Sequence, residues 1–335
     1  MAGVLAIFGQ HERKLESLLN QATRQQLNDI FAAARRTVAD NSSLPSDRLS
    51  AIQLLGNNLT GQPADTDLLG RLLAPQNSPQ LQSAAVEALA SRATEQSAQQ
   101  LLTGWKSHSP ALRSQILDVL LSRPSWTELL LAAISRGDVL AGHIDPRRRQ
   151  QLLQHNDAAI HQRAEQLLAG AIDASRQKVI EQYRDIASLA GDAAAGKTVF
   201  NKRCAACHLG DGVGYAVGPD ITALTDRSPT AMLVAVLDPN RAVEDRFLDY
   251  LAVTADGRQF TGMLSNETGS SITLTGQEGK QVVILRSQLE ELHCSGKSLM
   301  PEGMEKDISR QELANLLAYL AGPMAKTNPA PSPRP

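Results

Sequence analysis

The five residues Cys204-Ala205-Ala206-Cys207-His208 constrain this chain more than any other stretch. The two intervening residues place both thiols on one edge of a helical turn, and the next position brings an imidazole beneath that edge. This spacing is the attachment pattern of c-type haem, in which both sulfurs bond to the porphyrin and the histidine ligates the iron. The sequence therefore predicts one covalent haem c held by Cys204, Cys207 and His208.

Two other kinds of site use paired cysteines. A thioredoxin-like redox pair needs a βαβ context, and a zinc site needs a second Cys or His pair at metal-ligand spacing. The sequence supplies neither context, and its remaining histidines show no metal-ligand pattern. The third cysteine, Cys294, has no partner for an internal disulfide and is interpreted as a small buried apolar side chain.

Composition favours a helical protein and argues against nucleic acid as a partner and against a membrane-spanning segment. The 335 residues are enough for two domains, and aromatic residues make up only 3% of them, which suits helices packed through aliphatic side chains. A net charge of -2 gives no electrostatic case for binding nucleic acid. No apolar run reaches the roughly 18 residues of a membrane helix, so no transmembrane segment is expected.

Residues 1–173 predict a series of short amphipathic helices. Apolar residues recur at helical spacing over residues 10–40, and further helices are expected over 46–56, 78–91, 96–105, 109–122, 126–136, 145–154 and 156–170. Several begin with a capping residue followed by proline, as at Ser78-Pro79 and Ser109-Pro110. The match between residues 79–90 and 110–121 resembles HEAT or armadillo-type repeats, which implies an α-solenoid of helix pairs. Such an array serves either as a docking surface for another protein or as a spacer. Residues 174–190, which follow it, are expected to form a linking helix.

Residues 191–326 predict a second domain whose first and last helices cross. Asp192 caps a helix over 193–203, and Ser309 with Glu312 forms a capping box that opens the last helix. Gly196 and Phe200, set against Leu316 and Tyr319, resemble the helix crossing of class I cytochromes c. That resemblance implies a class I cytochrome c fold.

Two further motifs resemble the iron site of the same cytochromes. Gly218-Pro219 resembles their Gly-Pro-x-Leu loop, which implies that the Pro219 carbonyl accepts a hydrogen bond from the second ring nitrogen of His208. Met300-Pro301 resembles their Met-Pro pair, which implies that Met300 is the sixth iron ligand. Met304, His293 and Cys294 are close enough in sequence to compete for that place.

A small antiparallel β insertion is expected at about residues 247–286. Residues 248–254 and 259–264 alternate around an Asp256-Gly257 turn, as in a hairpin, and residues 271–274 and 281–285 add two strands. No minimal cytochrome has such a sheet, which should pack beside the haem.

Residues 190–322 resemble the haem-binding domain family described from Pirellula- and Verrucomicrobium-type bacteria. The marks are Asp238-Pro239-Asn240, Thr254 to Gly257, Arg286-Ser287 and Ser298 to Gly303. In that family the domain often follows HEAT-like repeats and a propeller resembling sugar dehydrogenases. The resemblance implies a dehydrogenase as electron donor, fused upstream or separate, and a downstream electron acceptor.

Together these features predict an electron carrier rather than an enzyme. The alternative is a gas sensor or peroxide-reactive cytochrome with a labile or non-methionine sixth ligand; a di-haem peroxidase would need a second Cys-x-x-Cys-His. A third reading makes the helical repeats a partner-binding scaffold. Haem c is attached outside the cytoplasm, so we expect a periplasmic or otherwise exported protein whose signal has been removed, or a piece of a larger dehydrogenase. The proline-rich segment 327–335 is expected to be disordered.

Overall fold

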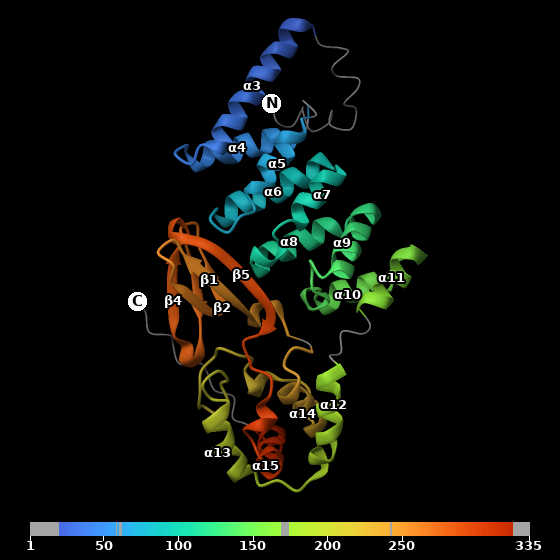
Figure 1. Cartoon of the computed structure of the whole chain (residues 1–335), viewed down its shortest axis with the longest axis vertical. Coiled ribbons are helices and arrows are strands. Elements are labelled where there is room, and N and C mark those ends of the chain that lie inside the picture. The colour runs from blue at the N-terminus through green and yellow to red at the C-terminus, as the bar shows by residue number, and fades with distance from the viewer. Residues whose placement is uncertain (1–19, 58, 60–61, 169–173, 242, 324–335) are drawn as a thin grey trace.

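The structure is a computed structural model that describes residues 20–57, 59, 62–168, 174–241 and 243–323. It has three parts, which Figure 1 shows from top to bottom as a group of helices, a five-stranded sheet and a smaller group of helices. Leu15, Leu18 and Leu19, at the start of the apolar period expected over residues 10–40, lie outside the described residues, as does the proline-rich segment 327–335. The rest of that period lies in a helix. Among the described helices, none is both long and apolar enough to cross a bilayer.

The first part consists of short helices, most of which begin where the sequence predicts. Ser78 caps one of them by accepting a hydrogen bond from the Leu81 N–H, and Pro79 occupies the first helical position, where a missing N–H costs nothing. The helix α5, which follows Gln62, has no counterpart among the expected helices. The helices are α3 (Gln21–Ala39), α4 (Pro45–Gly56), α5 (Pro63–Arg71), α6 (Pro79–Arg92), α7 (Glu95–Leu102), α8 (Pro110–Leu120), α9 (Pro124–Arg136), α10 (Pro146–Leu153) and α11 (Ala158–Leu168).

These helices share one apolar core. Each packs against its neighbour in sequence or the next but one, as α4 does with α6, α6 with α8 and α5 with α7. Their buried side chains form a continuous cluster from Phe31 to Leu168. No single helix pair could bury its apolar face alone, so each pair is stabilised by those beside it.

The sheet has the strand order β4-β3-β2-β1-β5, with every neighbouring pair antiparallel. Four strands correspond to the expected insertion, and the β1–β2 turn contains Gly257 at φ +81. The fifth strand was not expected and carries the sheet beyond residue 286 to Ser298. The strands are β1 (Leu248–Thr254), β2 (Gln259–Glu267), β3 (Ser271–Thr275), β4 (Gln281–Leu285) and β5 (Leu289–Ser298).

The last part is a compact group of helices with its own core, formed by α12 (Ala174–Tyr183), α13 (Ala193–Arg203), α14 (Pro229–Leu237) and α15 (Arg310–Ala321). The segment 174–190, expected to be a linking helix, is helical in α12 and in the 3-10 helix η3 (Arg184–Ser188). Its Ile180 and Ile186 are buried in the same cluster as Phe200 and Leu316. The segment therefore belongs to the core of this last part, where α12 packs on α14 and η3 packs on both α14 and α15.

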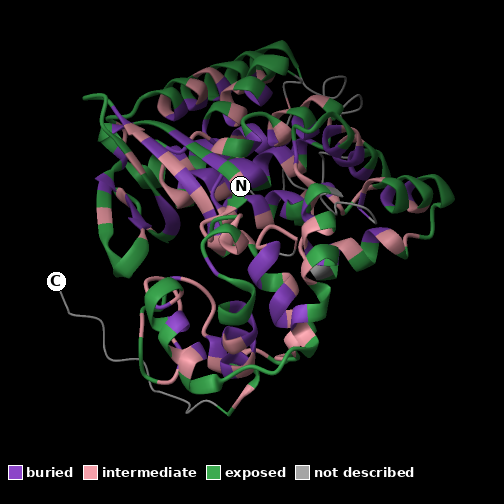
Figure 2. Cartoon of the chain, turned by 60° about the horizontal axis from the view of Figure 1, so that its bottom comes forward, coloured by how far each residue is buried: buried purple, intermediate pink, exposed green. Residues whose placement is uncertain are grey.

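One side of the sheet packs on the first group of helices, and Figure 2 shows that both the strands and these helices carry buried residues, coloured purple. Arg113 of α8 is fully buried, with its Nη1 3.4 Å from the sulfur of Cys294 on β5. The Tyr250 hydroxyl of β1 donates to the carbonyl oxygen of His108 (3.1 Å). Burial lowers the pKa of His108 to about 4, so this imidazole is neutral at pH 7. The first group of helices thus holds one side of the sheet, and other parts of the sheet contact the last group of helices.

Candidate haem site

The helix α13 ends directly before the Cys-x-x-Cys-His turn and packs closely against α15. The Asp192 side chain caps α13 by accepting from the Ala194 N–H (2.8 Å). At Gly196 the two backbones are so close that a Cβ would lie 2.0 Å from the Asn315 carbonyl oxygen. The rings of Phe200 and Tyr319 pack nearby, with centroids 5.5 Å apart. The helix crossing that the sequence predicts is therefore present.

The two thiols face apolar surroundings just beyond the end of α13. The Cys204 N–H donates to the Phe200 carbonyl (2.8 Å) and the His208 N–H to the Cys204 carbonyl (2.9 Å), so the chain continues in a helical turn through the motif. Burial, assisted by the neighbouring Cys207, raises the pKa of Cys204 to about 12. Burial raises the pKa of Cys207 as well, and both thiols are protonated at neutral pH.

The imidazole of His208 is held by the loop that follows it. Its Nδ1 lies 2.9 Å from the Pro219 carbonyl oxygen, which accepts the ring proton and leaves the lone pair on Nε2. Burial lowers the pKa of His208, which keeps the ring neutral and able to donate that lone pair. A Cβ on Gly218 would lie 2.6 Å from Cε1 of the ring, so only glycine allows the loop this close.

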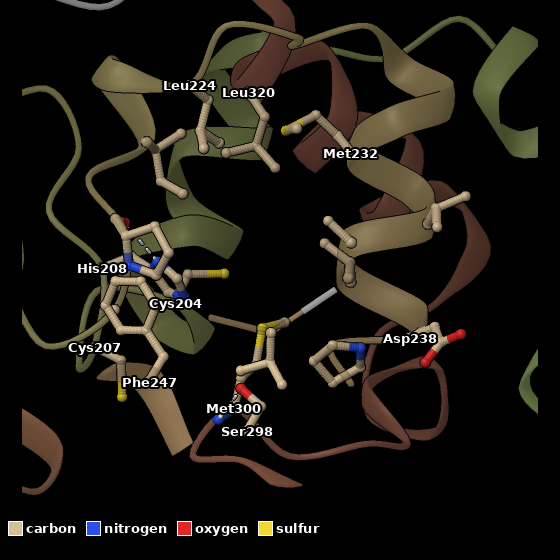
Figure 3. Close-up of a pocket in the computed structure, with 18 of the residues that line it drawn as sticks. Cys204, Cys207, His208, Leu224, Met232, Asp238, Phe247, Ser298, Met300 and Leu320 are labelled. Carbon is tan, nitrogen blue, oxygen red and sulfur yellow. Dashed lines mark hydrogen bonds between the residues drawn. The ribbon is translucent and has the colours of Figure 1, made fainter. Parts of the chain in front are cut away.

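The motif opens onto a cavity of about 680 Å³, within the range of sites for large ligands. Figure 3 shows Cys204 and His208 on one wall, Met232 on another, and Met300 and Ser298 on a third. Most of the lining is aliphatic or aromatic, including Phe200 and Leu320. A pair of thiols, an imidazole with a free nitrogen and thioethers, set in an apolar cavity, is a donor set that fits an iron porphyrin.

The loop that carries Met300, residues 299–303, follows β5 directly and is called the Met300 loop below. The Met300 N–H donates to the Ser298 hydroxyl (3.1 Å), and the Leu299 N–H donates to the carbonyl of Phe247 (3.1 Å). Phe247, which ends the 3-10 helix η5 (Asp245–Phe247) before β1, also lines the cavity. Strand β5 and the start of β1 thus set where the loop meets the cavity.

The other candidates for the sixth ligand do not line this cavity. His293 and Cys294 belong to β5, where His293 is exposed and Cys294 faces the first group of helices. Met304 packs against the core of the last part. The cavity contains instead two methionines that sequence reasoning missed, Met232 of α14 and Met263 of β2. No motif surrounds either of them, so nothing in the sequence marked them.

The sheet also touches the motif itself. The backbone N–H of Glu278, in the turn between β3 and β4, donates to the Ala206 carbonyl within Cys-x-x-Cys-His (2.7 Å). In the same region, Gly279 lies against the ring of Tyr215, which follows the motif. The insertion therefore packs beside the Cys-x-x-Cys-His motif.

Comparison with known proteins places one region of the chain in a family. No curated protein matches the chain. The family model of cytochrome c matches residues 193–283, from the start of α13 into β4, and its match ends before Met300. Residues 193–283 are therefore the cytochrome c domain of this chain, which supports a role in binding haem c covalently and transferring electrons.

Proposed function

We propose that the protein is an electron-transfer cytochrome with one haem c, bonded to Cys204 and Cys207 and ligated by His208 and Met300. The observation that carries the proposal is the shared cavity: both thiols, the imidazole and the Met300 thioether line one apolar space. The oriented His208 ring supports the same assignment, because its Nε2 is left free to donate.

The protein's own part in this function is to hold two ligands still and to keep water away. Bound haem iron takes up and releases one electron. The Pro219 carbonyl fixes the His208 tautomer, and the proline ring restricts the backbone that carries this carbonyl. The apolar lining lowers the local dielectric constant. With the His208 imidazole and the Met300 thioether both bound, the coordination of the iron would be alike in the two redox states, which would favour rapid electron transfer over binding of a substrate.

Absorption spectroscopy and carbon monoxide test this function. We expect the oxidised protein to show the near-infrared charge-transfer band of a thioether–iron bond, and the reduced protein to bind carbon monoxide slowly and incompletely because Met300 occupies the sixth position. Rapid stoichiometric binding of carbon monoxide, with no such band, would instead support the gas-sensing alternative and exclude the His/Met assignment.

We further propose that the electron donor is a dehydrogenase, either fused to this protein or separate from it. In this proposal α3–α11 form HEAT-like helix pairs on which the dehydrogenase docks. We also propose that the protein is exported. The packing of successive helices around one core supports the repeat proposal. Deleting these helices would uncover Tyr250 and Cys294, so charge reversal at exposed residues is the sharper test. Electron uptake from the dehydrogenase should fall in such variants of α3–α11, and uptake equal to the unmodified protein's would exclude docking there.

A further inference from the structure

The connection after α14 lies against the Met300 loop. Asn240, three residues beyond the end of α14, has its side chain between the two ends of that loop. Its Oδ1 accepts from the backbone N–H of Ser298 (2.7 Å). Its Nδ2 donates to Oε1 of Glu302 (2.5 Å). One amide therefore joins the residue two positions before Met300 to the residue two positions after it.

This bridge reaches the Met300 backbone through Ser298. The Ser298 hydroxyl accepts from the Met300 N–H (3.1 Å), so fixing Ser298 also fixes the start of the ligand residue. An asparagine suits the position because its amide both accepts and donates. Aspartate could accept from Ser298 but could not donate to Glu302, and an aliphatic residue could do neither.

Asn240 is itself held by the core of the last part. The neighbouring Asp238 is buried and pairs with Arg241 (3.0 Å), whose Nη2 donates to Gln177 of α12 (2.6 Å). Arg176, the residue before Gln177 in α12, donates to the Leu237 carbonyl (2.8 Å) at the end of α14. These contacts give α12 a role in the site, because they anchor the connection from which Asn240 reaches the loop.

Arg176 makes a second connection to the same region. Its guanidinium pairs with Glu305 (3.0 Å), just beyond the Met300 loop, and both side chains are more than nine-tenths buried. The chain on the far side of Met300 is thus tied to α12 as well. The loop is fixed from the helices of the last part and does not depend on β5 alone.

We propose that Asn240 is a positioning residue that holds Met300 in place for the iron, an inference that rests on the proposed His208/Met300 ligation. The thioether can compete with other ligands only while the loop stays in the ligating conformation. Loosening the loop lowers the population of that conformation and raises the apparent affinity of external ligands in proportion. Asn240 makes no contact with the iron in this proposal and acts only through the loop.

The test replaces Asn240 by alanine in the haem-loaded full chain and measures imidazole binding to the oxidised protein. Loss of the bridge removes both hydrogen bonds and should tighten imidazole binding roughly tenfold, which corresponds to about 1.4 kcal/mol, or about 0.7 kcal/mol for each bond. The pH at which the thioether–iron band disappears should fall by about one unit for the same reason. Amide hydrogen exchange in a peptide covering residues 298–303 should become faster. The control is Asn266→Ala at an exposed position on β2, which should leave all three measurements unchanged.

Glu302→Ala supplies a second variant at an exposed carboxylate and removes only one of the two hydrogen bonds. It should shift imidazole binding in the same direction by about threefold, and it decides the question if Asn240→Ala does not fold. Unchanged imidazole binding and unchanged exchange in the variants would overturn the proposal for Asn240. A missing band in the unmodified protein would instead overturn Met300 ligation, and hydrogen exchange would still show whether Asn240 holds the loop.

Discussion

Gly196→Ala is expected to destabilise the last part of the protein by about 3 kcal/mol, the upper end of the usual cost of overpacking. The added Cβ would lie 2.0 Å from the Asn315 carbonyl oxygen and 2.8 Å from Cβ of Tyr319. The first of these atoms is backbone on α15, so no side-chain rotation can relieve the clash and the two helices must separate. Alanine improves intrinsic helix propensity by about 1 kcal/mol, which is too little to offset this cost.

The same separation should also impair haem attachment, because α13 ends at the Cys204 turn. Denaturant unfolding followed by circular dichroism would measure the loss of stability, and the haem absorbance per protein would measure attachment. Gly142→Ala is the matched control, since a Cβ there meets no heavy atom within 4 Å. A Gly196→Ala protein as stable as the Gly142→Ala control would show that α13 and α15 do not cross this closely.

The crossing and the histidine loop could be predicted because each depends on a few residues at short, fixed spacing. Pro219 follows His208 closely enough that the loop must return to the ring, and the hydrogen bond is present at 2.9 Å. The capping box is present too: the Ser309 hydroxyl accepts from the Glu312 N–H, and the Glu312 carboxylate accepts from the Ser309 N–H. Motifs of this kind carry their own geometry.

Strand β5 could not be predicted because its sequence lacks regular alternation. Glu290 and Glu291 are adjacent exposed residues, and the pairing with β1 shifts register twice, so the apolar side chains do not fall on every second position. Its absence from the prediction also explains why His293 and Cys294 were considered as iron ligands. An extended strand advances about 3.3 Å per residue, so six or seven positions before Met300 place them far from the cavity.

The hydrogen bonds of Asn240 could not be predicted from the sequence either. Its two hydrogen-bond partners lie 58 and 62 positions further along the chain, and no local pattern links residues at such separation. For a related reason, the sequence does not show that α12 belongs to the core of the last part. A helix with Ile180 on its apolar face can be covered from either side of the chain, and only the fold shows that the cover comes from α14 and η3.

Met300→Ala should convert the protein from an electron carrier into one that binds external ligands at iron. Without the thioether, the oxidised protein should lose the near-infrared band, and the reduced protein should bind carbon monoxide rapidly and stoichiometrically. The reduction potential should fall by on the order of 0.1–0.2 V, a fraction of the roughly 0.8 V over which axial ligands tune haem. The loss of packing should be small, because Met300 is only partly buried, so a change in the stability of the haem-loaded protein would reflect mainly the lost thioether–iron bond.

Met232→Ala is the matched control, because Met232 lines the same cavity from α14 but is buried, at 6% exposed. Removing it leaves a void and should cost about 2–5 kcal/mol of stability, yet the near-infrared band should remain. The two variants therefore separate ligation from packing: Met300→Ala should lose the band at little cost in packing, and Met232→Ala should lose stability but keep the band. If Met232→Ala abolished the band and Met300→Ala kept it, the thioether ligand would be Met232, and the loop held by Asn240 would serve only to close the cavity.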